Sequence, residues 1–116
     1  MYESLINLGV QRTLEVLDGI FAFVFYDQQN ERLLLVRDHL GVKPLYYHVS
    51  ETQILFGSEP KVFFEMGLMK PVLNKNLLGE YFANGWIYEP DTLFEEIYKV
   101  EAGHYLCFDL KNKSVF

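Results

Sequence analysis

Two short segments constrain the fold more than any other feature of this sequence. Residues 20–26 and 33–36 are apolar at every position and rich in aromatic and β-branched side chains. A strand with one face in water alternates apolar and polar residues, whereas a strand covered on both faces does not. The chain must therefore place at least two strands inside a layered structure.

The other expected elements surround these strands. Helical spacing of leucine and valine predicts one helix over residues 2–17, with Gly19 as its left-handed C-terminal cap. Short runs bounded by turn residues predict strands over residues 45–49, 53–57, 97–100 and 105–110, and another from residue 114. Strands outnumber helices and short turns join many of them, so we expect an α+β fold with mostly antiparallel strands.

Two further helices are expected in the second half. Ser58 is the predicted N-cap of a helix that stops at Gly67, and Asn74 that of a helix over residues 75–83. One apolar stripe is predicted on the latter, formed by Leu77, Leu78, Tyr81 and Phe82.

Composition excludes several classes of protein. The 116 residues fit one domain, and half of them are apolar, which rules out intrinsic disorder. The net charge is −6 with no basic stripe, which argues against nucleic-acid binding. The longest apolar run has seven residues, too few for a membrane span, and no signal peptide is recognisable. A single cysteine fits a reducing compartment, so we expect a cytoplasmic protein.

No residue type is arranged for catalysis or metal binding. Cys107, the one thiol, lies between Leu106 and Phe108 in an expected strand, which favours a core position. Ser58 and Lys61 match a Ser-x-x-Lys pattern, but a helix N-cap followed by a surface lysine explains them better. The histidines (His39, His48 and His104) show no metal-site spacing with Cys107 or with one another. We therefore expect no catalytic residue and no metal ligand.

The most specific stretch is the loop after the second buried strand. It contains Arg37, Asp38, Gly41, Lys43 and Pro44, with Arg37 and Asp38 expected to pair at the strand end. A glycine bend and a pre-proline lysine indicate a backbone of fixed conformation. Two hypotheses remain open: a hydrogen-bonded structural connection, or an interface or ligand-binding loop.

Five segments together resemble the glutaminase domain of glutamine-hydrolysing asparagine synthetases. They are LDGIFAF at residues 17–23, RDHLGVKPLYY at 37–47, FGSEPK at 56–61, EYF at 80–82 and VEAGHYL at 100–106. The resemblance implies a class II glutamine amidotransferase of the N-terminal-nucleophile type, with a four-layer α/β/β/α sandwich. In that family an N-terminal cysteine hydrolyses glutamine. The ammonia passes to a synthetase domain that uses ATP and Mg²⁺ to activate aspartate, so no cofactor is expected in this chain.

The sequence departs from that family where the chemistry resides. Residue 2 is Tyr2 rather than cysteine, and neither the family's early segment nor its Ser-Gly-Gly-x-Asp-Ser synthetase loop occurs. We therefore expect residues 1–116 to be a single partial domain, a scaffold in asparagine biosynthesis without catalytic residues. Its expected partners are the missing N-terminal glutaminase half and the synthetase domain, in cis or in trans, with self-association through unpaired strand edges. The alternatives are a stand-alone non-catalytic binding module or decayed gene product and, more weakly, a hydrolase using Ser58 or Cys107.

Overall fold

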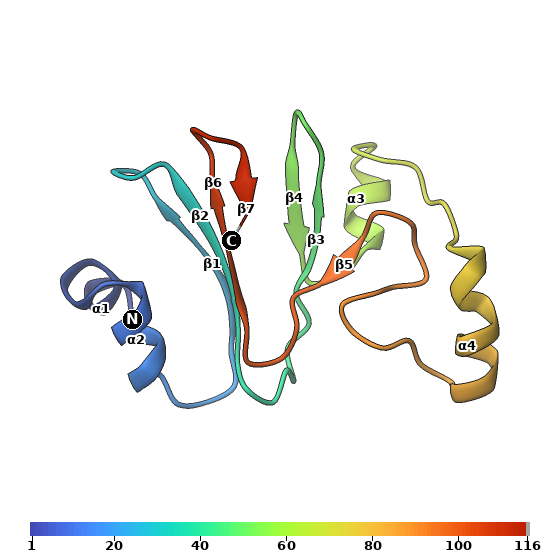
Figure 1. Ribbon diagram of the computed structural model, residues 1–116, viewed down its shortest axis with the longest axis horizontal. Coiled ribbons are helices and arrows are strands. Elements are labelled where there is room, and N and C mark those ends of the chain that lie inside the picture. The colour runs from blue at the N-terminus through green and yellow to red at the C-terminus, as the bar shows by residue number, and fades with distance from the viewer. Residues whose placement is uncertain (116) are drawn as a thin grey trace.

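Two antiparallel sheets with helices outside them form the fold in the computed structural model (Figure 1). The structure describes residues 1–115, apart from the side chains of Tyr2 and Ile6. The first sheet has the order β1-β2-β6-β7, with β1 Ala22–Asp27, β2 Arg32–Arg37, β6 Tyr105–Asp109 and β7 Ser114–Val115. The second has the order β4-β3-β5, with β4 Ile54–Gly57, β3 Tyr46–Val49 and β5 Tyr98–Lys99. Every strand pair is antiparallel, which confirms the expected α+β class.

Helices lie on the outer side of each sheet. Helices α1 (Tyr2–Leu8) and α2 (Val10–Val16) lie beside the first sheet, and α3 (Lys61–Glu65) lies beside the second. A short 3₁₀ turn, η1 (Lys75–Leu77), leads into α4 (Leu78–Asn84) at the end of the molecule farthest from α1 and α2 (Figure 1). None of the helices in residues 1–115 has the length and apolar character needed to cross a membrane.

The middle of the first sheet is covered on both faces, as its apolar segments predicted, and β2 and β6 carry its buried residues. Strand β1 is half-buried, and Ile20 and Tyr26 at the ends of the first apolar segment are exposed. On one face, Leu35 and Phe108 pack with Leu45 and Val100 between the two sheets. On the other face, the buried side chains pack against residues of α2 and the phenylalanines of the first strand segment. This second cluster contains Leu34, Val36, Cys107, Val10, Leu14, Phe21, Phe23 and Phe25. Burial on both faces explains why these strands carry no polar alternation.

The first helical segment differs from the prediction of one helix ending at a Gly19 cap. Gly9 adopts φ 78° and ψ 165°, which interrupts the helical path and separates α1 from α2. Leu17 after α2 is already extended, and Gly19 lies beyond it at φ 129°. The single-helix and cap predictions were wrong, because Gly9 breaks the helical path and the chain is already extended at Leu17, two residues before Gly19.

The later elements are shorter than predicted. Helix α3 begins at Lys61 after Pro60, so Ser58 is not its N-cap, whereas Gly67 at φ 69° follows its end as expected. Asn74 precedes η1 but makes no side-chain cap. The predicted strand over residues 97–100 contracts to β5, and the one over 105–110 ends at Asp109. A strand does begin at Ser114, while Phe116 lies outside the described residues.

Candidate functional site

Arg37 lies at the centre of a dense cluster of hydrogen bonds, four of which its own side chain donates. Strand alternation puts it on the same face of β2 as Leu33 and Leu35, the face that meets the second sheet. Only 6% of the residue is exposed. A charged group buried at that depth is costly unless it is paired and hydrogen-bonded, so its partners decide whether this strand end is stable.

The partners of Arg37 come from three separate segments. Its Nη1 donates to Glu89 Oε1 at 2.8 Å and to the Val100 carbonyl at 2.6 Å. Its Nε donates to the Lys43 carbonyl at 3.0 Å, and its Nη2 donates to the Gly41 carbonyl. The guanidinium thereby joins β2 to its own loop, to the segment before β5 and to the residue after β5. We name this group, with Asp38, the Arg37 cluster.

The expected ion pair between Arg37 and Asp38 was wrong. Glu89 carries the salt bridge to Arg37, and Lys99 Nζ lies 3.9 Å from the same carboxylate oxygen. Neighbouring residues on a strand point to opposite faces, so Arg37 and Asp38 diverge. The sequence held only a weak signal for Glu89, an acidic residue directly before a proline in an irregular segment.

Asp38 instead holds the backbone around it. One carboxylate oxygen accepts the Phe21 N–H at 3.1 Å, and the other accepts the N–H groups of Leu40 at 2.9 Å and Gly41 at 3.0 Å. Burial by itself would raise the pKa of Asp38, but the N–H donors of Leu40, Phe21 and Gly41 outweigh burial and lower it. Asp38 is therefore an ionised structural group that fixes the start of the loop.

Gly41 allows the guanidinium to approach the loop. Its φ is 61°, and a Cβ at this position would lie 2.8 Å from Ala102 Cβ and 3.0 Å from Arg37 Cζ. No larger residue fits there without displacing these atoms. Gly41 is thus required both by its backbone conformation and by the space that Arg37 occupies.

Other residues of the loop face outward. Lys43 contributes its carbonyl to the cluster while its side chain is exposed, and Pro44 is half-buried before Leu45 enters the core. Leu40 and Val42 at the loop tip are 76% and 56% exposed. The loop therefore combines a buried polar base with an exposed apolar tip. The base fits the hypothesis of a structural connection, and the tip fits the hypothesis of an interface.

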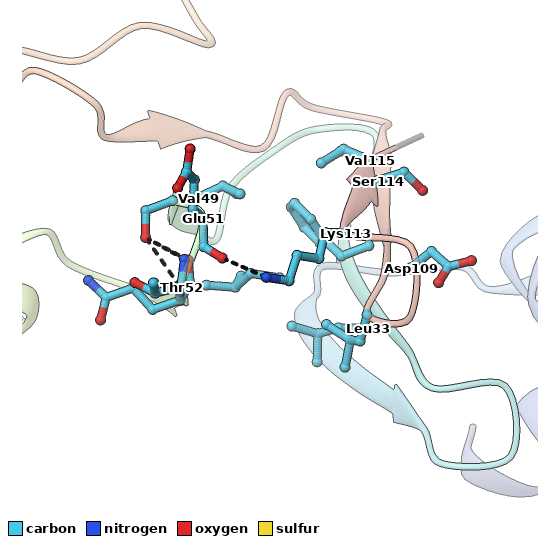
Figure 2. Close-up of a pocket in the computed structure, with 13 residues that line it drawn as sticks. Leu33, Val49, Glu51, Thr52, Asp109, Lys113, Ser114 and Val115 are labelled. Carbon is cyan, nitrogen blue, oxygen red and sulfur yellow. Dashed lines mark hydrogen bonds between the residues drawn. The ribbon is translucent and has the colours of Figure 1, made fainter.

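A separate pocket of about 350 Å³ opens between the two sheets at their hairpin ends (Figure 2). Leu33, Val49 and Val115 are among its apolar lining residues, and Lys113 Nζ reaches across to donate to the Glu51 carbonyl at 3.3 Å. The lining includes Ser50, whose Oγ accepts the Gln53 N–H at 3.2 Å within its own turn. None of the Arg37 cluster lines this pocket.

Among the remaining chemical candidates, only His39 and His104 come together, in a pocket of about 280 Å³ that Arg37 and Asp38 also line. Cys107 is buried in the core, and burial raises the pKa of its thiol, which disfavours the reactive thiolate. Lys61 Nζ pairs with Glu59 Oε2 at 3.1 Å, in the exposed turn where Ser58 also lies. His48 is buried against the Glu96 carbonyl at 2.9 Å, while His39 and His104 are exposed. Within the described residues, no group of three His, Cys, Asp or Glu could hold a metal ion.

Comparison with known proteins identifies the family. The family model of the glutamine amidotransferase domain matches residues 1–115. This chain belongs to the glutamine amidotransferase domain family. An asparagine synthetase (glutamine-hydrolyzing) of Bacillus subtilis is 37% identical over 93 residues, which cover 79% of this chain and 15% of that protein.

Two other relatives match a similar share of this chain. A putative asparagine synthetase (glutamine-hydrolyzing) of Methanocaldococcus jannaschii is 33% identical over 100 residues, covering 84% of this chain and 19% of that protein. An amidase of Gibberella zeae is 38% identical over 90 residues, covering 78% of this chain and 13% of that protein. This glutamine amidotransferase domain thus spans less than a fifth of the length of these relatives, and its resemblance to asparagine synthetases is confirmed.

Proposed function

We propose that residues 1–116 form the scaffold part of a glutaminase domain in an asparagine synthetase-like, glutamine-dependent amidotransferase. In this proposal the assembled enzyme hydrolyses glutamine and delivers the ammonia to ATP-activated aspartate. The family match and the names of the relatives support this reaction class. The arrangement of helices outside two facing sheets fits the α/β/β/α sandwich of N-terminal-nucleophile hydrolases.

The observation that carries the scaffold role is the internal satisfaction of the Arg37 cluster. Each nitrogen of the Arg37 guanidinium donates to a group of this chain, and both carboxylate oxygens of Asp38 accept backbone N–H groups. Arg37 and Asp38 line a pocket of about 280 Å³, but a ligand there would have to compete with these internal hydrogen bonds for either side chain. The cluster therefore supports the fold, and the nucleophile and oxyanion donors come from elsewhere in the enzyme.

The exposed tip of the same loop is suited to a domain contact. Ile20, Leu40 and Val42 are each more than half exposed, and Leu40 and Val42 sit on a backbone that the Arg37 cluster holds rigid. A rigid apolar tip loses little conformational entropy on docking. We assign this tip to the contact with the synthetase domain. In this proposal, ATP and Mg²⁺ bind to the synthetase domain.

The chain exposes more surface than a compact protein of its mass, which supports the proposal that a further polypeptide covers part of it. A compact protein of 13.6 kDa exposes about 6,600 Å², whereas this chain exposes 7920 Å². The excess exceeds the roughly 800 Å² that one partner contributes to a standard interface. The radius of gyration, 15.3 Å, is likewise larger than the ~13.4 Å of a compact domain this long. Both values fit a chain that buries more surface when the N-terminal glutaminase half joins it.

A segment exchange tests the scaffold role. Residues 17–110 would replace the matching segment of the Bacillus subtilis asparagine synthetase, and both glutamine- and ammonia-dependent asparagine synthesis would be measured. We expect both activities within about tenfold of the parent enzyme, because the exchange removes no catalytic group. Intact ammonia-dependent synthesis with no glutaminase activity would contradict the proposal.

An assay of the 116-residue chain by itself tests the expectation that it carries no nucleophile for glutamine hydrolysis. We expect no ammonia release from glutamine above the blank, since the only thiol is buried in the core. Release that Cys107→Ala abolishes would restore the hydrolase alternative.

A further inference from the structure

Four exposed aromatic side chains gather on α4 and the turn after it. Phe82 is 80% exposed, Tyr88 63%, Trp86 57% and Tyr81 39%. The helical spacing predicted one apolar stripe that includes Tyr81 and Phe82, and α4, which carries these two residues, lies at the outer end of the molecule (Figure 1). We name these four residues the aromatic surface. Exposed aromatic groups at this density mark interaction sites more often than ordinary surface.

The aromatic surface is held in one conformation. The Tyr88 N–H donates to Glu80 Oε1 at 3.1 Å, which ties the end of the turn back to α4. Gly85 reverses the chain at φ 80°, and its N–H donates to the Tyr81 carbonyl at 2.8 Å. The Trp86 and Tyr88 rings meet edge to face at 6.3 Å. A surface ordered before binding loses less entropy when a partner docks.

Acidic residues outnumber basic ones around this surface. Residues 76–98 contain five acidic residues and no Lys or Arg, while Lys75 and Lys99 flank this segment. Asp91 lines a groove of about 360 Å³ together with Tyr81 and Trp86. Lys99 also lines this groove, but its ammonium already lies 3.9 Å from Glu89 Oε1 and 5.6 Å from the centre of the Tyr46 ring. The groove therefore offers a partner the carboxylate of Asp91, whereas the ammonium of Lys99 is already paired.

We propose that the aromatic surface docks a basic, partly apolar polypeptide segment of a partner protein. Arg and Lys side chains complement the Asp91 and Glu80 carboxylates and stack on Trp86 and Tyr88, while apolar side chains cover Phe82. Nucleic acids and anionic membranes are disfavoured because their own negative charge faces these carboxylates. This docking role goes beyond the glutaminase scaffold and does not depend on it.

Trp86, the single tryptophan, provides a direct readout of binding to the 116-residue chain. The probe is a synthetic 14-residue helical peptide of Arg and Leu, compared with a counterpart of Glu and Leu. We expect the basic peptide to shift the Trp86 emission to shorter wavelength, and to bind at least tenfold more tightly than the acidic one. Raising the salt concentration should weaken the basic complex because the contact is partly electrostatic.

Variants separate the aromatic surface from the rest of the molecule. Phe82→Ser and Asp91→Asn should each weaken binding of the basic peptide at least fivefold, whereas Tyr26→Ser, at an exposed position of β1, should leave binding unchanged. Thermal melts confirm that each variant is folded. An unshifted Trp86 emission would overturn the proposal, as would equal binding of both peptides. A dimer of the free chain that Phe82→Ser dissociates would also overturn it, since the occupant would then be a second copy.

Discussion

The Arg37 guanidinium and the Glu89 carboxylate meet at 2.8 Å although 52 residues separate them in the sequence. Arg37 ends the second strand of the first sheet, and Glu89 lies in the segment between α4 and the second sheet. Their contact therefore ties the irregular segment of residues 85–97 to the face of the first sheet that meets the second sheet. Arg37 and Glu89 thus couple the two halves of the chain.

Removing the carboxylate should destabilise the fold. Glu89→Ala leaves the buried Arg37 without its counter-charge, and because Glu89 is 29% exposed we expect a loss of about 2 kcal/mol, less than for a fully buried pair. Glu59→Ala is the matched control, since it breaks the exposed pair with Lys61 and should cost under about 1 kcal/mol. Urea unfolding of both variants measures the difference, and equal midpoints would show that the Arg37 cluster contributes little.

A methyl group at Gly41 should be far worse tolerated than at Gly67. Both glycines have positive φ, 61° and 69°, so alanine costs about 1 kcal/mol of backbone strain at either position. Only at Gly41 does the new Cβ collide with Ala102 and Arg37, and overpacking adds about 1–3 kcal/mol. Denaturant melts of Gly41→Ala beside Gly67→Ala test this, and similar losses would mean that the loop moves aside freely.

Asp38 should make the fold sensitive to acid. Its pKa is lowered from 3.8 in the folded chain, because three backbone N–H donors outweigh burial. The unfolded chain therefore binds the proton first as the pH falls. The stability that the carboxylate confers is complete above its unfolded pKa, and is lost as the pH falls through the lower folded value.

The variant Asp38→Asn tests this dependence. At pH 7 we expect a lower melting temperature than wild type, since an amide cannot accept all three N–H groups. The difference in melting temperature should narrow as the pH falls through the lowered pKa of Asp38, because the wild-type carboxylate then loses its charge. A constant gap from pH 7 to pH 2 would show that the carboxylate charge is not what holds the loop.

The exposed loop tip should matter for the contact that couples glutamine hydrolysis to asparagine synthesis, rather than for folding. Leu40→Ser changes a side chain that is 76% exposed, so the free energy of unfolding should move by less than about 0.5 kcal/mol. In the exchanged synthetase the same variant should lower glutamine-dependent synthesis and leave ammonia-dependent synthesis unchanged. Val49→Ser, at an exposed site on the second sheet, is the control. If both variants behave alike, the tip does not contact the synthetase domain.

Cys107 should react only when the core opens. Its thiol is buried between the first sheet and α2, and burial raises its pKa, so labelling by a disulfide reagent should be at least about 100-fold slower than for an exposed cysteine. Ser58→Cys combined with Cys107→Ala provides that exposed reference on the same fold. Rapid labelling of wild type without denaturant would place the thiol outside the core.

The inner layer of this fold was predictable because its cause is local. The unbroken apolar character of residues 20–26 and 33–36 indicates cover on both faces. The structure supplies it for residues 21–25 and 33–36, with the second sheet on one side and α2 on the other, while Ile20 and Tyr26 stay exposed. The positions of the antiparallel hairpins followed from their turn residues. The importance of the loop that begins at Arg37 was also evident from its residue types.

Tertiary structure alone decided which groups the Arg37 side chain and the apolar stripe of α4 contact. The sequence suggested a pair between Arg37 and Asp38, but strand alternation separates neighbours, and only the folded chain brings Glu89 across 52 residues to the guanidinium. The helical period of α4 was read correctly, yet its stripe faces solvent at Phe82, because no other layer of this chain reaches it. Local patterns determine which segments need cover, whereas long-range packing determines what provides that cover and which apolar faces stay exposed.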